Sequence, residues 1–190
     1  MARIYLISPE VISDIPMFLL QLKEIFELEF KPALFQLRLK NVETDELERV
    51  ILKIKPLCEN YGVEMILNDD ISLALKYNIG VHVGSSDASL QELEFFKKSS
   101  SKTAGVSCYN SVSRAKMFEL ADYISFGAIF PSSTKKNAPV CEKSTIVEFA
   151  NVSNAKISII GGITAENMEE ISDIMPFVEY ICVVSEVWGK

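Results

Sequence analysis

Gln36, Arg38 and Lys40 alternate with two leucines along one short segment of the sequence. In an extended chain successive side chains point to opposite faces, so these three polar side chains are expected to share one face. The arginine presents paired planar donors and the lysine a compact charge, and both suit phosphate oxygens. The segment therefore predicts an anion-binding face, and the alternative is an edge strand whose polar side is solvated.

A second polar group, Asn68, Asp69 and Asp70, ends an apolar run further along the chain. A carboxylate at the end of a strand can hold the Mg²⁺ that phosphates carry with them. Asp69 can instead cap the helix that is expected to begin near residue 71. The two polar segments predict a site for a phosphorylated ligand, provided that the fold brings them to one place.

The composition is that of an ordinary single-domain protein. A chain of 190 residues with 48% hydrophobic content can bury a substantial core, so we expect one domain over residues 1–190. The sequence shows neither the roughly 18 to 20 uncharged residues of a membrane span nor a signal-peptide pattern, so a cytoplasmic protein without a membrane partner is expected. The net charge of −7 argues against a nucleic-acid partner, because general nucleic-acid binders need basic surface. The four cysteines form no CxxC pair, which predicts reduced packing residues rather than zinc ligands or disulfides.

Short apolar or β-branched runs alternate with amphipathic segments along the chain. The runs predict strands over residues 4–7, 33–39, 64–67, 80–83, 103–107, 123–129, 156–160 and 180–184. Helical periodicity predicts helices over residues 16–30, 44–59, 89–98, 111–120, 144–150 and 165–175. Eight strands are more than a doubly wound sheet of this length usually needs, so the expected fold is a parallel α/β barrel, the (β/α)8 TIM barrel.

The last strand poses a difficulty for this fold. Only six residues follow Val184, so the eighth helix is expected to be short or missing. Either a partner subunit, which would make the protein a homo-oligomer, or an earlier element must then cover the outside of that strand.

Catalytic groups of such a barrel lie at the carboxyl ends of its strands. Polar or flexible residues occupy most of these positions, namely Arg38 and Lys40, Asn68 and Asp69, Asp87, Ser107, the loop over residues 131–136, Gly161 with Gly162, and Ser185. Glycines let the backbone approach a phosphate closely, and the loops after strands seven and eight commonly hold phosphate. Two anion sites are therefore expected, one lined by cations and one made of hydroxyls and backbone amides.

Each of these features also has a purely structural explanation. The glycine pair can be a turn, residues 131–136 an exposed polar loop, and Asp87 the cap of a helix that begins near residue 89. His82, the single histidine, alternates with two valines, which favours a packed or hydrogen-bonded side chain over an acid or base. The joint placement of so many polar groups at one barrel mouth favours a functional site.

The ordered motifs of the chain resemble those of the thiamine phosphate synthase family from the first strand to the last. The motifs that carry the resemblance are residues 36–40, 67–70, 80–84 with Asp87, 105–107, 121–123, 127–131, Thr134 with Lys135, 160–163 and 183–185. The resemblance implies an enzyme that joins 4-amino-2-methyl-5-hydroxymethylpyrimidine diphosphate to thiazole phosphate, forming thiamine phosphate and releasing diphosphate.

The resemblance also implies roles for individual residues. It implies that six residues contact the pyrimidine diphosphate: Gln36, Arg38, Lys40, Asn68, Ser107 and Lys135. Four of these are the implied catalytic residues, namely Arg38, Lys40, Ser107 and Lys135. It implies a thiazole phosphate site made of Ser132, Ser133, Thr134, Gly162, Val184 and Ser185, and a Mg²⁺ site made of Asp69 and Asp87. A substitution in which diphosphate departs first needs no strong base, because the metal and the cations neutralise the leaving group.

Several positions depart from the family pattern. Ser85 stands where glutamine is common, Ser132 where threonine is common, and Tyr109 where histidine is frequent. With the short C-terminus, these differences affect the thiazole side more than the pyrimidine side. Two alternatives stay open. One is the related thiazole tautomerase, which uses a histidine in the segment after the fifth strand, and the other is a degenerate, noncatalytic barrel that binds phosphorylated metabolites.

Overall fold

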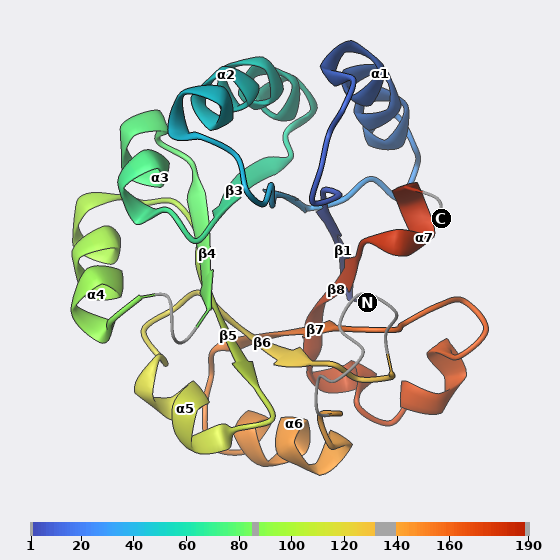
Figure 1. Cartoon of the computed structure of the whole chain (residues 1–190). Helices are drawn as coiled ribbons and strands as arrows, with labels where there is room; N and C mark the ends of the chain where they lie inside the picture. Colours follow the sequence, from blue (N-terminus) through green and yellow to red (C-terminus); the bar gives the residue numbers. More distant parts are fainter. Residues whose placement is uncertain (1, 85–87, 132–139, 189–190) are drawn as a thin grey trace.

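Eight parallel strands close into one barrel in chain order, and β1 (Arg3–Ile7) completes the ring by pairing with β8 (Val178–Val183), as Figure 1 shows. The computed structural model describes residues 2–84, 88–131 and 140–188, apart from the side chain of Ser185. Helices surround the ring on the outside (Figure 1). The expected (β/α)8 architecture is confirmed.

The remaining elements alternate around this ring. The other strands are β2 (Leu34–Leu37), β3 (Glu64–Asn68), β4 (Gly80–Gly84), β5 (Ala104–Tyr109), β6 (Tyr123–Gly127) and β7 (Lys156–Ile160). The helices are α1 (Ile15–Phe26), α2 (Thr44–Tyr61), α3 (Ile71–Tyr77), α4 (Leu90–Ser99), α5 (Val112–Met117), α6 (Lys143–Ala150) and α7 (Ser185–Trp188). Within the described ranges, no helix combines the length and apolar character that crossing a membrane requires.

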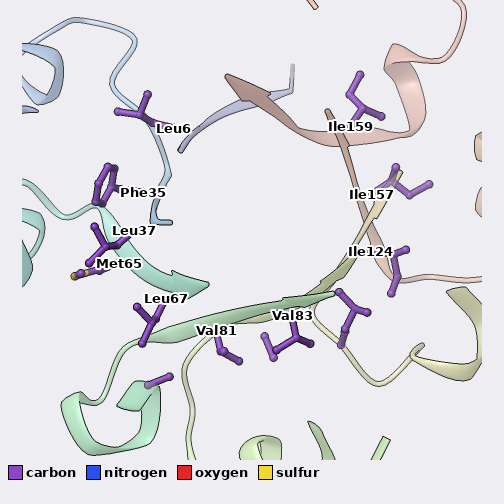
Figure 2. Close-up of a cluster of buried hydrophobic side chains, with 14 of the residues drawn as sticks. Leu6, Phe35, Leu37, Met65, Leu67, Val81, Val83, Ile124, Ile157 and Ile159 are labelled. Atoms are coloured by element: carbon purple, nitrogen blue, oxygen red, sulfur yellow. The ribbon is translucent and has the colours of Figure 1, made fainter. Parts of the chain in front are cut away.

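The two faces of the strands carry different layers of side chains. The outer layer packs beneath the helices, and Figure 2 labels ten of its members: Leu6, Phe35, Leu37, Met65, Leu67, Val81, Val83, Ile124, Ile157 and Ile159. A smaller inner layer contains Tyr5, Ile7, Leu34, Ile66, Tyr123, Tyr180 and Cys182. Because side chains alternate along a strand, Phe35 and Leu37 in the outer layer leave Gln36 inside the barrel. All four cysteines are buried and free, as predicted.

Strand β2 ends at Leu37, earlier than the predicted residue 39. The backbone N–H of Arg38 donates to Ser8 Oγ (2.9 Å) and that of Lys40 to the carbonyl of Glu10 (3.0 Å). The chain thus stays beside the segment that follows β1 without continuing the regular ladder of hydrogen bonds. Both cationic residues therefore project from the barrel mouth rather than from the strand itself.

The helix predicted over residues 165–175 is wrong. This segment instead contains two 3₁₀ helices, η1 (Met168–Ile171) and η2 (Met175–Phe177). Asn167 accepts from the N–H of Thr164 (2.8 Å) and donates to the carbonyl of Gly162 (2.7 Å), so its side chain fixes the entry to the segment as a turn. Pro176 stands one residue beyond the predicted helix, in the first turn of η2.

The eighth helix is short, as predicted, because α7 forms a single turn. Its Trp188 donates from the indole N–H to the carbonyl of Ile7 (2.6 Å) and packs its ring against Phe18 of α1, with centroids 4.9 Å apart. Figure 1 shows α7 next to α1 beside the junction of β1 and β8. Helix α1 and Trp188 thus cover this junction. The predicted self-association stays a prediction.

Candidate active site

A cavity opens inside the barrel mouth, and residues from seven of the eight strands line it. These are Tyr5 and Ile7 of β1, Gln36 of β2, His82 of β4, Ser107 and Tyr109 of β5, Ser125 and Gly127 of β6, Ile160 of β7, and Cys182 and Val183 of β8. The segments after the strands add Arg38, Ala128, Gly161 to Thr164, Val184 and Glu186. Because parallel strands end at the same rim, residues far apart in the sequence meet here.

The cationic group predicted from the sequence lies at two depths. Gln36 is buried inside the barrel and donates from Nε2 to the hydroxyl of Tyr5 (2.6 Å). Arg38 lines the cavity nearer the rim and forms an ion pair with Glu10. Lys40, which follows β2, reaches the end of the neighbouring strand β3, where its Nζ is 3.2 Å from Asp69 Oδ2. The structure therefore joins the two polar segments, and it excludes the solvated-edge alternative for Gln36.

Asp69 is placed for a role at the rim rather than in a helix cap. Its neighbour Asp70 caps α3, accepting from the N–H of Leu73 (2.8 Å), so the capping role proposed for Asp69 is wrong. Asp69 has φ +68°, a left-handed conformation that is uncommon outside glycine and the Asn/Asp pair. Its carboxylate is about one-third exposed and accepts from Asn68 Nδ2 as well as from Lys40.

The donor set around Asp69 fits Mg²⁺. This ion keeps several waters and takes one or two protein carboxylates together with substrate phosphates, so one accessible carboxylate beside cations is a suitable site. The second predicted ligand, Asp87, lies outside the described residues. Within the described ranges, no three acidic, histidine or cysteine side chains are grouped so that they could hold a metal ion. A site of this composition depends on a phosphorylated ligand to complete the coordination.

The floor of the cavity contains polar groups that the sequence analysis did not assign to the site. His82 Nδ1 is 2.8 Å from the hydroxyl of Tyr123, and its Nε2 is 2.8 Å from Ser107 Oγ. The Tyr123 hydroxyl is 2.7 Å from that of Tyr5. A buried tyrosine needs a hydrogen-bond partner for its hydroxyl. The presence of Tyr5 and Tyr123 in otherwise apolar strands was therefore the sequence signal that could have indicated a polar network inside the barrel. The hydrogen-bonded reading of His82 is confirmed.

Burial lowers the pKa of His82 to about 4; nearby Asp69 opposes this shift and Arg38 adds to it. In the unfolded chain the imidazole of His82 binds a proton below about pH 6.5, whereas in the native protein it stays neutral. The free energy of unfolding therefore falls as the pH drops from 6.5 towards 4. We expect the free energy of unfolding to be lower by about 2 kcal/mol at pH 5 than at pH 7 from this group.

Urea unfolding of the wild type and of His82→Gln at both pH values isolates this contribution, because the carboxylates common to both proteins cancel in the difference. The NMR titration of the single imidazole gives the native pKa directly. A midpoint near 6.5 would contradict the burial of a neutral ring.

The opposite side of the cavity is formed by the segments after β6, β7 and β8. Gly161 (φ +105°) and Gly162 (φ +64°) have backbone conformations that other residues rarely adopt. A Cβ on Gly161 would lie 2.7 Å from Ala128 Cα, and one on Gly162 would lie 2.8 Å from the carbonyl oxygen of Pro131. The glycine pair therefore allows two rim segments to approach closely, and Gly162 and Val184 line the same cavity as Arg38.

Several predicted contacts on this side cannot be placed. Ser132, Ser133, Thr134 and Lys135 lie outside the described residues, and Ser185 is described only as the first residue of α7. The structure adds Tyr109, Thr164 and Glu186 to the cavity lining. Sequence spacing gave no indication of these last two residues. Thr164 reaches the rim through the turn after β7, and Glu186 through the single turn of α7.

Comparisons with known proteins agree with this architecture. Residues 4–187 match the family described as thiamine monophosphate synthase. The thiamine-phosphate synthase of Methanobrevibacter smithii is 37% identical over 74% of this chain and 68% of its own length, and that of Pelagibacter ubique is 32% identical over 98% and 89%. The solved thiamine phosphate pyrophosphorylase of Pyrococcus furiosus has the same fold, with a TM-score of 0.82, 24% identity, and coverage of 99% of this chain and 88% of that one. The chain belongs to the thiamine monophosphate synthase family.

Proposed function

We propose that the protein is a thiamine phosphate synthase, a transferase that condenses the pyrimidine diphosphate with thiazole phosphate and releases diphosphate. The observation that carries the proposal is the composition of one cavity. It combines Arg38 at the rim, Gln36 and Ser107 deeper in the barrel, and a glycine-rich backbone at Gly162 on the far side. The Lys40 and Asp69 pair lies at the adjoining strand end. Two phosphorylated ligands can thus meet head to head across the barrel mouth.

On the pyrimidine side, one group of residues would recognise the pyrimidine ring and another would neutralise the charge of the diphosphate. Gln36, Asn68 and Ser107 supply neutral hydrogen-bonding groups that suit a pyrimidine and its substituents. Arg38 and Lys40 face the rim, where the diphosphate would lie, and Lys135 is assigned to the same group by the family resemblance alone. Preorganised cations that meet the charge of a leaving group are typically the largest contribution to such a reaction.

Asp69, together with Asp87, would hold Mg²⁺ against the diphosphate. The bound ion would neutralise charge that develops on the departing oxygens. The chain's own contribution is to hold the pyrimidine, to keep the cations at the rim, and to exclude water from the apolar cavity wall while the thiazole nitrogen attacks. The described residues nearest the reaction include no accessible strong base, which suits a substitution led by departure of the leaving group.

On the thiazole side, Gly162, Val184 and Ser185 would bind the phosphate with the loop that contains Ser132, Ser133 and Thr134. Support for this half is the close approach of the two rim segments at the glycine pair. The carboxylate of Glu186 in the same lining is unfavourable next to a phosphate, so this residue would have to point away from the anion.

The decisive assay incubates the protein with both phosphorylated precursors and Mg²⁺ and follows thiamine phosphate and diphosphate. Formation of both products supports the proposal. Isomerisation of the thiazole without any pyrimidine would indicate the tautomerase, although the single histidine has both ring nitrogens occupied inside the barrel. Binding of the precursors without turnover would indicate the noncatalytic barrel.

The Arg38→Gln variant tests the leaving-group side of this site. We expect kcat/KM to fall about tenfold to a hundredfold, because one charge-assisted contact to the diphosphate is lost. Arg3→Gln is a matched control, since Arg3 also pairs with a glutamate, Glu179, but at the opposite end of the barrel. Equal losses in the two variants would contradict a direct role for Arg38.

A further inference from the structure

A chain of hydrogen bonds crosses the floor of the cavity and connects two of the proposed substrate contacts. It runs from Gln36 Nε2 to the hydroxyl of Tyr5 (2.6 Å), on to that of Tyr123 (2.7 Å), then to His82 Nδ1 (2.8 Å), and from His82 Nε2 to Ser107 Oγ (2.8 Å). We call these five residues the relay. They come from β2, β1, β6, β4 and β5, and both ends of the relay line the cavity.

The direction of the first bonds follows from the chemistry of the amide. With the Gln36 amide oriented as in the structure, its nitrogen donates and the Tyr5 oxygen accepts. The Tyr5 proton is then left for Tyr123, its other hydrogen-bond partner in the described part of the chain. Burial raises the pKa of both phenols, so both keep their protons. The reverse direction would leave the Tyr5 proton buried without an acceptor, which proteins strongly avoid. Tyr123 therefore donates its proton to His82 Nδ1.

The tautomer of His82 follows from that bond. A neutral imidazole that accepts at Nδ1 carries its proton on Nε2, so it donates to Ser107 Oγ. Ser107 then has its own hydroxyl proton available for a ligand. At the other end, Gln36 Oε1 has no hydrogen-bond partner within the described ranges, although the residue is only 2% exposed.

We propose that Tyr5, Tyr123 and His82 are positioning residues that hold His82 as the Nε2-protonated tautomer and thereby present Ser107 as a hydrogen-bond donor and Gln36 Oε1 as an acceptor to the substrate. The identity of that substrate rests on the proposed function, whereas the tautomer is a property of the free protein. An aminopyrimidine carries a ring-nitrogen acceptor next to an exocyclic amine donor. The relay would therefore match the protein's donor and acceptor to this edge before the substrate binds.

The wild-type protein alone provides the first test. Because the sequence contains a single histidine, the imidazole nitrogens of the ¹⁵N-labelled chain can be assigned without ambiguity. At neutral pH and without ligand, long-range ¹H–¹⁵N correlation is expected to show a protonated Nε2 and an unprotonated Nδ1. The opposite tautomer would reverse every bond of the relay and overturn the proposal, even if the protein is an active synthase. The expected tautomer in a protein without synthase activity would instead contradict the proposed function.

The second test interrupts the relay at its centre with Tyr123→Phe. We expect the two tautomers of His82 to become mixed, and the KM for the pyrimidine diphosphate to rise on the order of tenfold while that for thiazole phosphate stays within about twofold. Tyr180→Phe is the matched control, because its ring packs edge-on against those of Tyr5 and Tyr123 while its hydroxyl accepts from Arg3 outside the relay.

The control is expected to keep both the wild-type tautomer and the wild-type KM values. A fixed Nε2-protonated imidazole in Tyr123→Phe would overturn the proposal, as would equal effects of the two substitutions. Should Tyr123→Phe fail to fold, the wild-type spectrum still decides the tautomer.

Discussion

Asp69→Asn is expected to lower kcat/KM by about 10²- to 10³-fold and to raise the Mg²⁺ concentration needed for half-maximal rate. The substitution keeps the shape of the side chain but removes the negative charge that would hold the ion, so the leaving diphosphate loses its strongest electrostatic partner. Initial rates measured over a series of Mg²⁺ concentrations, with both precursors in excess, separate the loss of metal affinity from the loss of maximal rate.

The adjacent residue supplies the control. Asp70 caps α3 through its side chain, and asparagine is an equally good cap, so Asp70→Asn should leave activity and Mg²⁺ dependence close to those of the wild type. If Asp69→Asn retained the Mg²⁺ dependence of the wild type, the assignment of this carboxylate to the metal would be wrong. Both variants remove one negative charge from the same turn, so long-range electrostatics cannot explain a difference between them.

The charged residues at the rim are already paired before any ligand binds. Arg38 contacts Glu10, and Lys40 contacts Asp69, with both partners in the second pair more than one-third exposed. Ion pairs at such exposure contribute only about 0 to 1 kcal/mol, so exchanging a carboxylate for a diphosphate oxygen costs little. Each of these two cations thus has an acidic partner in a chain of net charge −7. We infer that ligand binding replaces these pairs rather than adding charges to an empty site.

The strands could be predicted from the sequence because side chains alternate between the two faces of any strand, whatever packs against it. The alternation correctly put Gln36 on the opposite face from Leu37, and the run of residues 156–160 matches β7 in both bounds. The 3₁₀ segment after β7 could not be predicted, since its apolar spacing is compatible with a helix. There, the hydrogen bonds of one side chain, that of Asn167, fix the turn that opens the segment.

The positions of the candidate site residues could be predicted where they follow a strand end, and less so where they depend on a contact between strands. Asp69 and Asp70 are chemically identical neighbours, and only the backbone conformation separates the cap from the accessible carboxylate. Tyr5 and Tyr123 are 118 positions apart, and nothing in either strand reveals that their hydroxyls meet. Polar networks inside a barrel combine residues from several strands, so sequence spacing carries no record of them.

Gly105→Ala is expected to destabilise the protein by about 3 kcal/mol or more, at or above the upper end of the usual cost of overpacking a core. A Cβ at this position would lie 1.9 Å from Cζ of Tyr123, whose ring is fully buried. That ring cannot retreat, because the rings of Tyr5, His82 and Tyr180 each pack against it with centroids 5.6 Å away. Urea unfolding followed by far-UV circular dichroism measures the loss.

A second glycine distinguishes this steric effect from the general cost of replacing glycine. Gly62 has φ +64° at the end of α2, and a Cβ there would meet no atom within 4 Å, so Gly62→Ala should cost only the backbone strain of about 1 kcal/mol. Gly105→Ala should cost less in a Tyr123→Leu background than in the wild type, because the shorter side chain leaves space for the added methyl group. If Gly105→Ala cost the same in both backgrounds, the clash with Tyr123 would not be the cause, and the close approach of β5 and β6 inside the barrel would have to be explained by the strands themselves.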